Sequence, residues 1–350
     1  MIDKKFWSGR RVFLTGHTGF KGAWLSLLLR RLGAEVHGFA LAPDHPGGVF
    51  EVADVERDIH HTVGDIRDPA ALAAALKAAR PEVVIHMAAQ SLVRVSYAEP
   101  VRTFQTNVMG TVNLLEAARH APKVRAVLVV TSDKCYENFD WVLGYRETDR
   151  LGGRDPYSAS KGCAEMVTAA YRQSFYSAPG TAAVATVRAG NVFGGGDWAT
   201  DRLIPDAMRA FGSDEVLRIR NPHAVRPWQH VFDVLLAYLV LCELLVHKGH
   251  DFAEAWNIGP SIDHEVPVSA IVERVTRLWG DGAGWQQDGG DHPHESKFLR
   301  LDCSKAYARF GWKSRIALDR GLELAVAWYR AARKGADMRA FSHAQLAEFI

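Results

Sequence analysis

The sequence has only four cysteines, and they lie far apart. Cys135, Cys163, Cys242 and Cys303 contain no Cys-x-x-Cys pair. Zinc sites and small disulfide frameworks need paired or regularly spaced cysteines. The spacing therefore argues against both and is typical of reduced thiols, so we expect a cytoplasmic protein.

A strong net charge and a long apolar run are also missing. Lysine and arginine total 42 and aspartate and glutamate total 40. Such a balanced chain has no broad field for nucleic acid or a membrane surface, and neither is an expected partner. The longest apolar stretch, near 234–246, is interrupted by Tyr238, Cys242 and Glu243, and the segment 1–16 has no apolar signal core. We therefore expect neither a membrane span nor export.

A pattern of metal ligands is lacking as well. The segment 291–295, DHPHE, contains two histidines and two acidic residues. Its spacing matches no helical pair of ligands, so a polar loop is expected there. The sequence predicts no metal site.

What the sequence does contain is a glycine-rich turn between an expected strand at 11–16 and a helix ending at Gly33. Gly16, Gly19 and Gly22 have the GxxGxxG spacing, which lets backbone amides and a helix N-terminus approach a pyrophosphate. A tight turn without a ligand has similar glycines, but strand before and helix after favour dinucleotide binding. The other expected cofactor-binding residues of this turn are His17, Thr18, Phe20 and Lys21.

The second expected strand, at 34–41, ends without the acidic residue that commonly binds the adenosine ribose of NAD. Ala40 and Leu41 stand there, and no nearby arginine would bind the extra phosphate of NADP. NAD is the preferred cofactor, and we expect looser retention of it than in proteins that have the acidic residue.

Three later segments are expected to lie along the cofactor. Asp65 and Ile66 end a third strand, where they could flank the adenine, and Asn107 is embedded in a long helix at 100–120. A helix cap, a closely packed core or an ordinary buried polar residue would account for the same features without a ligand. The buried strand at 82–91 adds Ala88, Ala89 and Gln90.

Tyr157 and Lys161 lie four residues apart in the segment DPYSASKGCAE. On a helix they share one face, so the ammonium is expected to lower the pKa of the phenol toward neutrality. Such a tyrosine can act as a general base or acid on a substrate hydroxyl, and the lysine can donate to a cofactor ribose. Taken alone, the pair could equally start an ordinary helix.

Ser132, Asp133 and Lys134 follow a strand that begins at about 125. The carboxyl ends of parallel strands present side chains to ligands. A solvated charge pair in a loop would look similar, but the tyrosine and lysine follow at a helix-length distance. We expect these three residues to form one catalytic site with Tyr157 and Lys161.

The alternation of strands and helices up to about residue 194 predicts a Rossmann-type, doubly wound parallel α/β sheet. Residues 1–190 are expected to form the NAD-binding domain, with 229–258 returning to it. The rest, 191–228 and 259–350, is expected to form a smaller mixed α/β lobe for the substrate.

Six motifs together resemble the extended short-chain dehydrogenase/reductase family, and within it the CDP-glucose 4,6-dehydratases. They are TGHTGFKG (15–22), HMAAQSLVR (86–94), TSDKCYEN (131–138), DPYSASKGCAE (155–165), RAGNVFGGGDW (188–198) and RPWQHV (226–231). In the related dTDP-glucose dehydratases the triad at 132–134 reads Thr-Asp-Glu. The Ser-Asp-Lys found here indicates the CDP-sugar branch.

The resemblance implies NAD, CDP-glucose and a role in deoxysugar synthesis for lipopolysaccharide. Tyr157 would remove the C4 hydroxyl proton while a hydride leaves C4, Asp133 would protonate the departing C6 hydroxyl, and the hydride would return to C6. Lys134, if desolvated and flanked by Lys161, would abstract the C5 proton; alternatively it would stabilise the enolate. Ser132 would hydrogen-bond the C4 oxygen.

The resemblance also implies substrate contacts and a homodimer. Asn191 and Arg226 would hold the diphosphate, to which a guanidinium donates two hydrogen bonds. The helices near 100–120 and 157–176 would pair across the dimer, although their apolar stripes could equally be intrachain core. The further substrate-binding candidates are Ser91, Arg94, Arg202, Leu203 and Lys297.

Two alternatives share much of this pattern. A sugar-nucleotide 4-epimerase uses the same fold, cofactor, tyrosine and lysine but needs no acid and base for elimination, so Asp133 and Lys134 argue against it. A dinucleotide-binding module without activity typically lacks the tyrosine or the lysine, whereas this chain has both.

Overall fold

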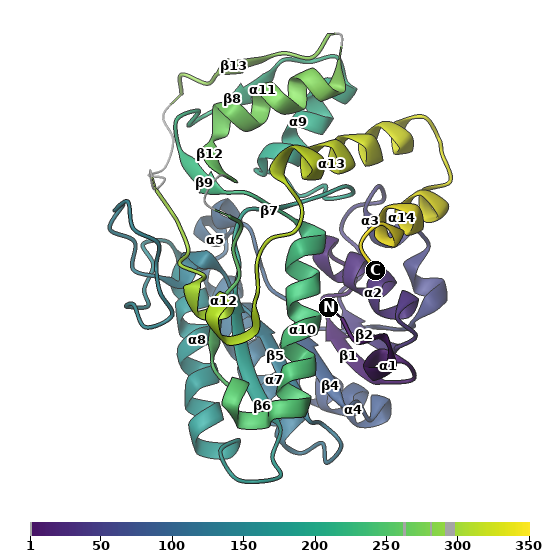
Figure 1. The fold of residues 1–350 in the computed structure, drawn as a ribbon, viewed down its shortest axis with the longest axis vertical. Helices are drawn as coiled ribbons and strands as arrows, with labels where there is room; N and C mark the ends of the chain where they lie inside the picture. Colours follow the sequence, from purple (N-terminus) through teal and green to yellow (C-terminus); the bar gives the residue numbers. More distant parts are fainter. Residues whose placement is uncertain (1, 262–263, 281, 291–297) are drawn as a thin grey trace.

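The computed structural model describes residues 2–261, 264–280, 282–290 and 298–350. A seven-stranded parallel sheet of order β11-β6-β5-β4-β1-β2-β3 forms its centre (Figure 1). The predicted doubly wound α/β sheet is therefore confirmed. Its strands are β1 (Arg11–Thr15), β2 (Glu35–Ala40), β3 (His60–Val63), β4 (Val83–His86), β5 (Ala126–Val130), β6 (Ala183–Arg188) and β11 (Ala255–Asn257).

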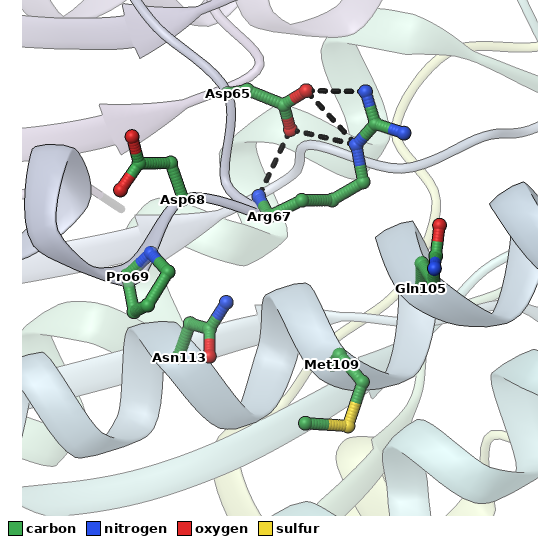
Figure 2. Close-up of a pocket in the computed structure, with 7 residues that line it drawn as sticks. All are labelled: Asp65, Arg67, Asp68, Pro69, Gln105, Met109 and Asn113. Atoms are coloured by element: carbon green, nitrogen blue, oxygen red, sulfur yellow. Dashed lines mark hydrogen bonds and ion pairs between the residues drawn. The ribbon is translucent and has the colours of Figure 1, made fainter.

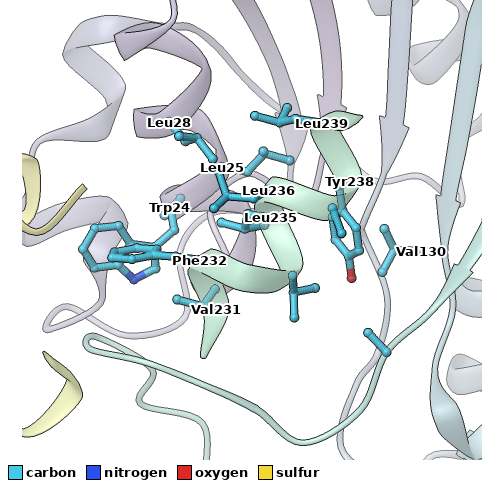
Figure 3. Close-up of a cluster of buried hydrophobic side chains, with 14 of the residues drawn as sticks. Trp24, Leu25, Leu28, Val130, Val231, Phe232, Leu235, Leu236, Tyr238 and Leu239 are labelled. Atoms are coloured by element: carbon cyan, nitrogen blue, oxygen red, sulfur yellow. The ribbon is translucent and has the colours of Figure 1, made fainter. Parts of the chain in front are cut away.

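Helices pack on both faces of this sheet, and a hydrophobic cluster fills each side. One cluster joins Leu25 and Leu28 to Leu235 and Leu236 and reaches Val130 (Figure 3). These side chains come from β5 and from α2 (Phe20–Arg31) and α10 (Val231–Lys248). The helices of the other face are α4 (Pro69–Ala79), α7 (Gly110–Arg119) and α8 (Pro156–Phe175).

The segment 229–258 contributes α10 and the edge strand β11 to the sheet layer. β11 pairs in parallel with β6, with Trp256 opposite Val187. α10 is apolar on nearly all sides, and its residues from Val231 to Leu239 are buried. A helix that is hydrophobic on nearly all sides is a buried helix, which explains why apolar residues dominate this segment despite its few polar interruptions.

Smaller elements form a second lobe, which lies above the central sheet in the view of Figure 1. Its strands pair as three short two-stranded sheets, β10 with β7, β12 with β9, and β13 with β8. The elements are β7 (Val192–Phe193), α9 (Leu203–Gly212), β8 (Leu217–Ile219), β9 (Val225–Pro227), β10 (Gln229–His230), β12 (Glu265–Pro267), α11 (Val268–Trp279), β13 (Trp285–Gln287) and α13 (Leu318–Arg333).

The last helices leave this lobe and contact the sheet domain again. α12 (Ser304–Phe310) lies against β11, and α14 (Met338–Ala347) places Arg339 on Asp58, 2.7 Å apart. The remaining short elements are α1 (Lys4–Trp7), α3 (Val49–Val52), η1 (Val55–Asp58), α5 (Val93–Ala98), α6 (Pro100–Phe104), η2 (Gln105–Met109), η3 (Asp133–Cys135) and η4 (Gly249–Phe252). None of the described helices has both the length and the hydropathy that a bilayer span requires.

Candidate active site

The turn between β1 and α2 has glycine where a side chain would collide. A Cβ on Gly16, which has a φ of +76°, would lie 2.7 Å from the Ala88 nitrogen, and a Cβ on Gly22 would overlap the Gly16 carbonyl oxygen. Gly19 precedes α2, and among the described residues no side chain caps that helix. Its first amides are thus left for another partner, which is the arrangement that suits a pyrophosphate.

Two side chains of this turn are engaged within the protein. His17 is fully buried, its Nε2 lies 2.6 Å from Nδ1 of His61, and burial lowers the pKa of His17 to about 3. The Thr18 hydroxyl donates to the Leu41 carbonyl at 3.0 Å. Both side chains hold the turn against the segments of β2 and β3. A ligand at this turn would therefore bind the main-chain amides of these residues rather than their side chains.

Asp65 and Ile66 follow β3, and Asp65 lines a pocket of about 550 Å³ (Figure 2). The Arg67 guanidinium binds both carboxylate oxygens of Asp65 and lowers the pKa of that carboxyl. Ile66 is buried and its carbonyl accepts from Asn113 at 2.9 Å. An adenine bound there would compete with Arg67 for Asp65. The pocket is lined by Asp65, Arg67, Asp68, Pro69, Gln105, Met109 and Asn113.

Asn107 clamps the loop that follows β4. The long helix expected at 100–120 contains a π-helical turn, η2, and such turns occur frequently at functional sites. Within it, Asn107 accepts from the Gln90 amide at 2.8 Å and donates to the Gln90 carbonyl at 2.9 Å and to the Ser160 hydroxyl at 2.8 Å. The loop carrying Ala88 and Ala89 is thereby fixed to α8.

The structure brings the predicted catalytic residues together. Ser132 and Asp133 follow β5, and Tyr157 and Lys161 lie on the first turns of α8; all four are buried. Lys161 Nζ donates to the Val130 carbonyl at 3.3 Å, so the start of α8 meets the end of β5. Their roles in catalysis stay predictions.

The surroundings of Asp133 favour the carboxylic acid form more than those of an ordinary aspartate do. Its Oδ1 accepts from the Ser132 hydroxyl at 3.0 Å, and its Oδ2 is buried with no partner among the described residues. Burial raises the pKa of Asp133, against the lowering effect of Lys134 and Arg226. A protonated Oδ2 can donate to a leaving group.

The low pKa expected for Tyr157 is wrong for this structure. Burial raises the pKa of Tyr157 to about 12, although the Ser132 hydroxyl lowers it. The physical reason is that the buried phenol loses the water that would solvate its ionised form. The Lys161 ammonium donates to the Val130 carbonyl instead, and burial lowers its own pKa to about 8. The protein by itself therefore keeps a neutral phenol.

The lysine that the structure places within electrostatic range of Lys161 is Lys21 of α2, whereas Lys134 is half-buried and acts on Asp133. Burial and then Lys161 lower the pKa of Lys21 to about 7. The Lys21 ammonium lies 6.0 Å from the ring centre of Tyr238. The side chains of Lys21, from α2, and Lys161, from α8, are thus close enough to interact electrostatically.

Sequence reasoning missed Tyr238 of α10. Its ring is fully buried, its hydroxyl has no hydrogen-bond partner in the described part of the chain, and burial, with a smaller contribution from Tyr157, raises its pKa. The one signal was its position as a polar interruption in an apolar run.

The predicted substrate-binding residues lie on several elements. Arg202 bridges Asp197 at 2.8 Å and the Ser91 hydroxyl at 2.9 Å, and Arg94 pairs with Asp201 at 2.9 Å. Asn191 has a φ of +47°, Leu203 begins α9, and Arg226 is buried in β9 near Asp133. Lys297 and the segment 291–295 lie outside the described residues.

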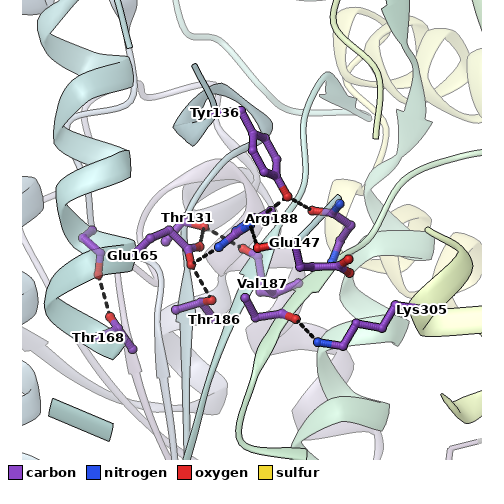
Figure 4. Close-up of polar contacts among 12 residues, drawn as sticks. Thr131, Tyr136, Glu147, Glu165, Thr168, Thr186, Val187, Arg188 and Lys305 are labelled. Atoms are coloured by element: carbon purple, nitrogen blue, oxygen red, sulfur yellow. Dashed lines mark hydrogen bonds and ion pairs between the residues drawn. The ribbon is translucent and has the colours of Figure 1, made fainter. Parts of the chain in front are cut away.

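A buried ion pair fixes α8 one turn beyond Lys161 (Figure 4). Glu165 accepts from Arg188 at 2.7 Å, from Thr131 at 2.5 Å and from Thr186 at 2.7 Å. Arg188 also donates to the Tyr136 hydroxyl at 2.7 Å. This network joins α8, β6 and the end of β5 next to the predicted catalytic residues. No motif or spacing in the sequence indicates it.

Comparison with known proteins then assigns the family. A family profile described as "GDP-mannose 4,6 dehydratase" matches residues 13–325. The chain belongs to this family. The CDP-glucose 4,6-dehydratase of Salmonella typhimurium is 49% identical to it over 355 residues, which cover 100% of this chain and 99% of that protein.

Solved structures with the same fold include members with bound cofactor. DesIV, a dTDP-glucose 4,6-dehydratase from Streptomyces venezuelae with NAD bound, is 25% identical, with a TM-score of 0.77 over 94% of this chain and 99% of that one. An epimerase from Methanothermobacter thermautotrophicus is 21% identical, with a TM-score of 0.80 over 96% of each chain. The epimerase supports the fold alone.

Proposed function

We propose that this protein is an NAD-dependent CDP-glucose 4,6-dehydratase of deoxysugar synthesis, located in the cytoplasm. It would convert CDP-D-glucose to CDP-4-dehydro-6-deoxy-D-glucose and water. The observation that carries the proposal is the end-to-end similarity to the Salmonella protein, combined with Ser132, Asp133 and Lys134 beside Tyr157 and Lys161. An epimerase would have no use for the buried acid at position 133.

The uncapped N-terminus of α2 and the glycines before it fit the diphosphate of NAD. When bound, NAD would take a hydride from C4, return it at C6 and add the positive charge of its oxidised ring. Residues 1–190 with 229–258 would hold it, and 191–228 with 259–350 would hold the sugar nucleotide. Lys161 would donate to the nicotinamide ribose.

Tyr157 would accept the C4 hydroxyl proton. Because burial holds the pKa of its phenol at about 12, it needs additional positive charge nearby when it ionises. Arg202 already lowers that pKa, and Lys161 is four residues away on the same helix. Ser132 would then donate to the C4 oxygen.

Asp133 would act in the elimination. The C4 ketone acidifies the C5 proton, which the amine of Lys134, half-buried beside Asp133, would accept. The protonated Oδ2 of Asp133 would donate to the departing C6 hydroxyl, so that water leaves across C5 and C6. The ammonium formed on Lys134 would then stabilise the enolate charge. Arg226 and Asn191 would hold the substrate diphosphate.

A substrate panel tests this function. Purified protein with NAD is incubated separately with CDP-glucose, dTDP-glucose, UDP-glucose and GDP-mannose, and 4-keto-6-deoxy sugar is measured by its absorbance in alkali. Product is expected from CDP-glucose alone. Product from another nucleotide would keep the reaction and discard the substrate, and interconversion of glucose and galactose nucleotides would replace the dehydratase by an epimerase.

Asp133→Asn is expected to slow product formation by about a hundredfold while C4 oxidation continues, because an amide cannot deliver the proton to the leaving hydroxyl. Rapid mixing with CDP-glucose should then accumulate reduced nicotinamide without product. Asp337→Asn, which changes an exposed helix cap on α14 in the same way, should behave as wild type. Equal loss of both steps would refute the separate role of Asp133.

We propose that the protein forms a homodimer through the helices near 100–120 and 157–176. Val101 and Met109 on the long helix, and Met166 and Phe175 on α8, are 68%, 50%, 55% and 49% exposed. α6 and α7 pack beside α8, so these side chains lie on adjacent helices. A second copy would cover the apolar surface that they leave in water.

Met166→Glu is expected to convert the dimer to a monomer, because the interface would have to bury an unpaired carboxylate. Light scattering on a size-exclusion column measures the mass. Val216→Glu, at a position that is 53% exposed between α9 and β8, is the control and should stay dimeric. A Met166→Glu dimer would place the interface elsewhere.

A further inference from the structure

Glu35, His37 and His60 meet at the edge of the central sheet. β2 and β3 run in parallel with His37 directly opposite His60, and Glu35 is two residues before His37 on the same face of β2. The two imidazole rings stack with centroids 4.4 Å apart and an interplanar angle of 14°. Strand register alone thus places three potential ligands side by side.

The ligand atoms of this group converge. Nε2 of His37 lies 2.9 Å and Nε2 of His60 lies 3.6 Å from Oε1 of Glu35. One ligand atom from each residue falls within 4.8 Å of the other two, and no second such group occurs in the described ranges. An ion with bonds of about 2.0–2.2 Å to nitrogen and oxygen needs ligand atoms at about this separation.

The neighbouring arginine orients the carboxylate. Arg11 Nε lies 3.2 Å from Oε2 of Glu35, which leaves Oε1 directed at the histidines. A partner of this kind around a metal ligand fixes its orientation. The side chain of His60 is 65% exposed, so water can complete the coordination.

We propose that Glu35, His37 and His60 form a binding site for one divalent transition-metal ion, with Zn²⁺ as the expected occupant. Two imidazoles and one carboxylate suit Zn²⁺ or its neighbours in the first transition row better than Mg²⁺ or Ca²⁺, which prefer all-oxygen ligands. The site is separate from the catalytic residues, because Glu35 and His60 begin their strands whereas the catalytic residues follow the ends of theirs.

The ion would cross-link the edge of the sheet. β3 pairs only with β2 in the seven-stranded sheet, and it leads directly to Asp65 and Ile66. An ion held by residues of both strands opposes separation of β3. Because it binds the folded arrangement, it stabilises the protein by mass action.

Calorimetric titration of the full-length, untagged, chelator-treated protein with ZnCl₂ tests the proposal. One site is expected in the wild type, with affinity at least about tenfold weaker in His60→Gln and in Glu35→Gln. Both positions are exposed or half-exposed, and circular dichroism of the metal-free variants verifies that they fold. Zn²⁺ should raise Tm in the wild type and leave Tm of His60→Gln unchanged.

The DHPHE segment supplies a control. Its two histidines, His292 and His294, are separated by one residue and flanked by acidic residues. The double variant His292→Ala/His294→Ala should keep the site. Loss of Zn²⁺ binding there, undiminished binding in His60→Gln, or no saturable binding to the wild type would each overturn the proposal. None of these results depends on turnover, so they leave the proposed dehydratase activity untouched.

Discussion

Tyr157→Phe is expected to lower kcat for CDP-glucose dehydration by about a thousandfold and to leave the fold intact. The phenol is the buried hydroxyl that adjoins Ser132, Asp133 and Arg202, and removal of a general base typically costs two to four orders of magnitude. The ring itself remains, so the packing at the start of α8 is preserved.

The measurement separates chemistry from binding. Reduced nicotinamide should fail to accumulate after rapid mixing with CDP-glucose, because C4 oxidation is the step that needs the base, and the binding of NAD should be unchanged. Tyr307→Phe, at a side chain that is 60% exposed on α12, is the matched control. Undiminished turnover by Tyr157→Phe would remove the proposed mechanism.

Arg188→Met is expected to lower the free energy of unfolding by about 3–5 kcal/mol, because it leaves the buried Glu165 carboxylate without its partner. The side chains of the pair are 3% and 2% exposed, so water cannot replace the lost guanidinium. Thr131 and Thr186 still donate to Glu165, which sets the cost below that of a fully isolated charge.

Urea unfolding followed by circular dichroism measures this change. The double variant Glu165→Gln/Arg188→Met removes both charges and should recover part of the lost stability, whereas Arg320→Met, on an exposed pair with Glu323, should change it little. A loss below about 1 kcal/mol in Arg188→Met, or no recovery in the double variant, would contradict the importance of the pair.

The proposed metal site and the buried ion pair of Glu165 and Arg188 both join residues that are distant in the sequence. Glu35 and His37 are close in sequence, but His60 joins them only through the register of β3 on β2. The DHPHE segment can be recognised in the sequence because its potential ligands lie within five consecutive residues. Ligands contributed by different strands leave no spacing to recognise, because the sheet and not the chain sets their separation.

The electrostatics of the catalytic residues show the same limit. The four-residue spacing of Tyr157 and Lys161 correctly places both on α8. It could not reveal that Lys161 donates to Val130, or that burial dominates the pKa of the phenol. Desolvation depends on everything packed around a group, and local spacing contains no information about it.

The sequence by itself determined the alternating strands and helices, the glycine turn before α2 and the motifs that identify the family. These features follow from local periodicity and from backbone geometry, which neighbouring residues specify. Only the tertiary structure decided that Lys21 lies within electrostatic range of Lys161, that Tyr238 of α10 lies within electrostatic range of Tyr157, and that Glu165 binds Arg188. Those contacts join residues far apart in the chain, and packing alone brings them together.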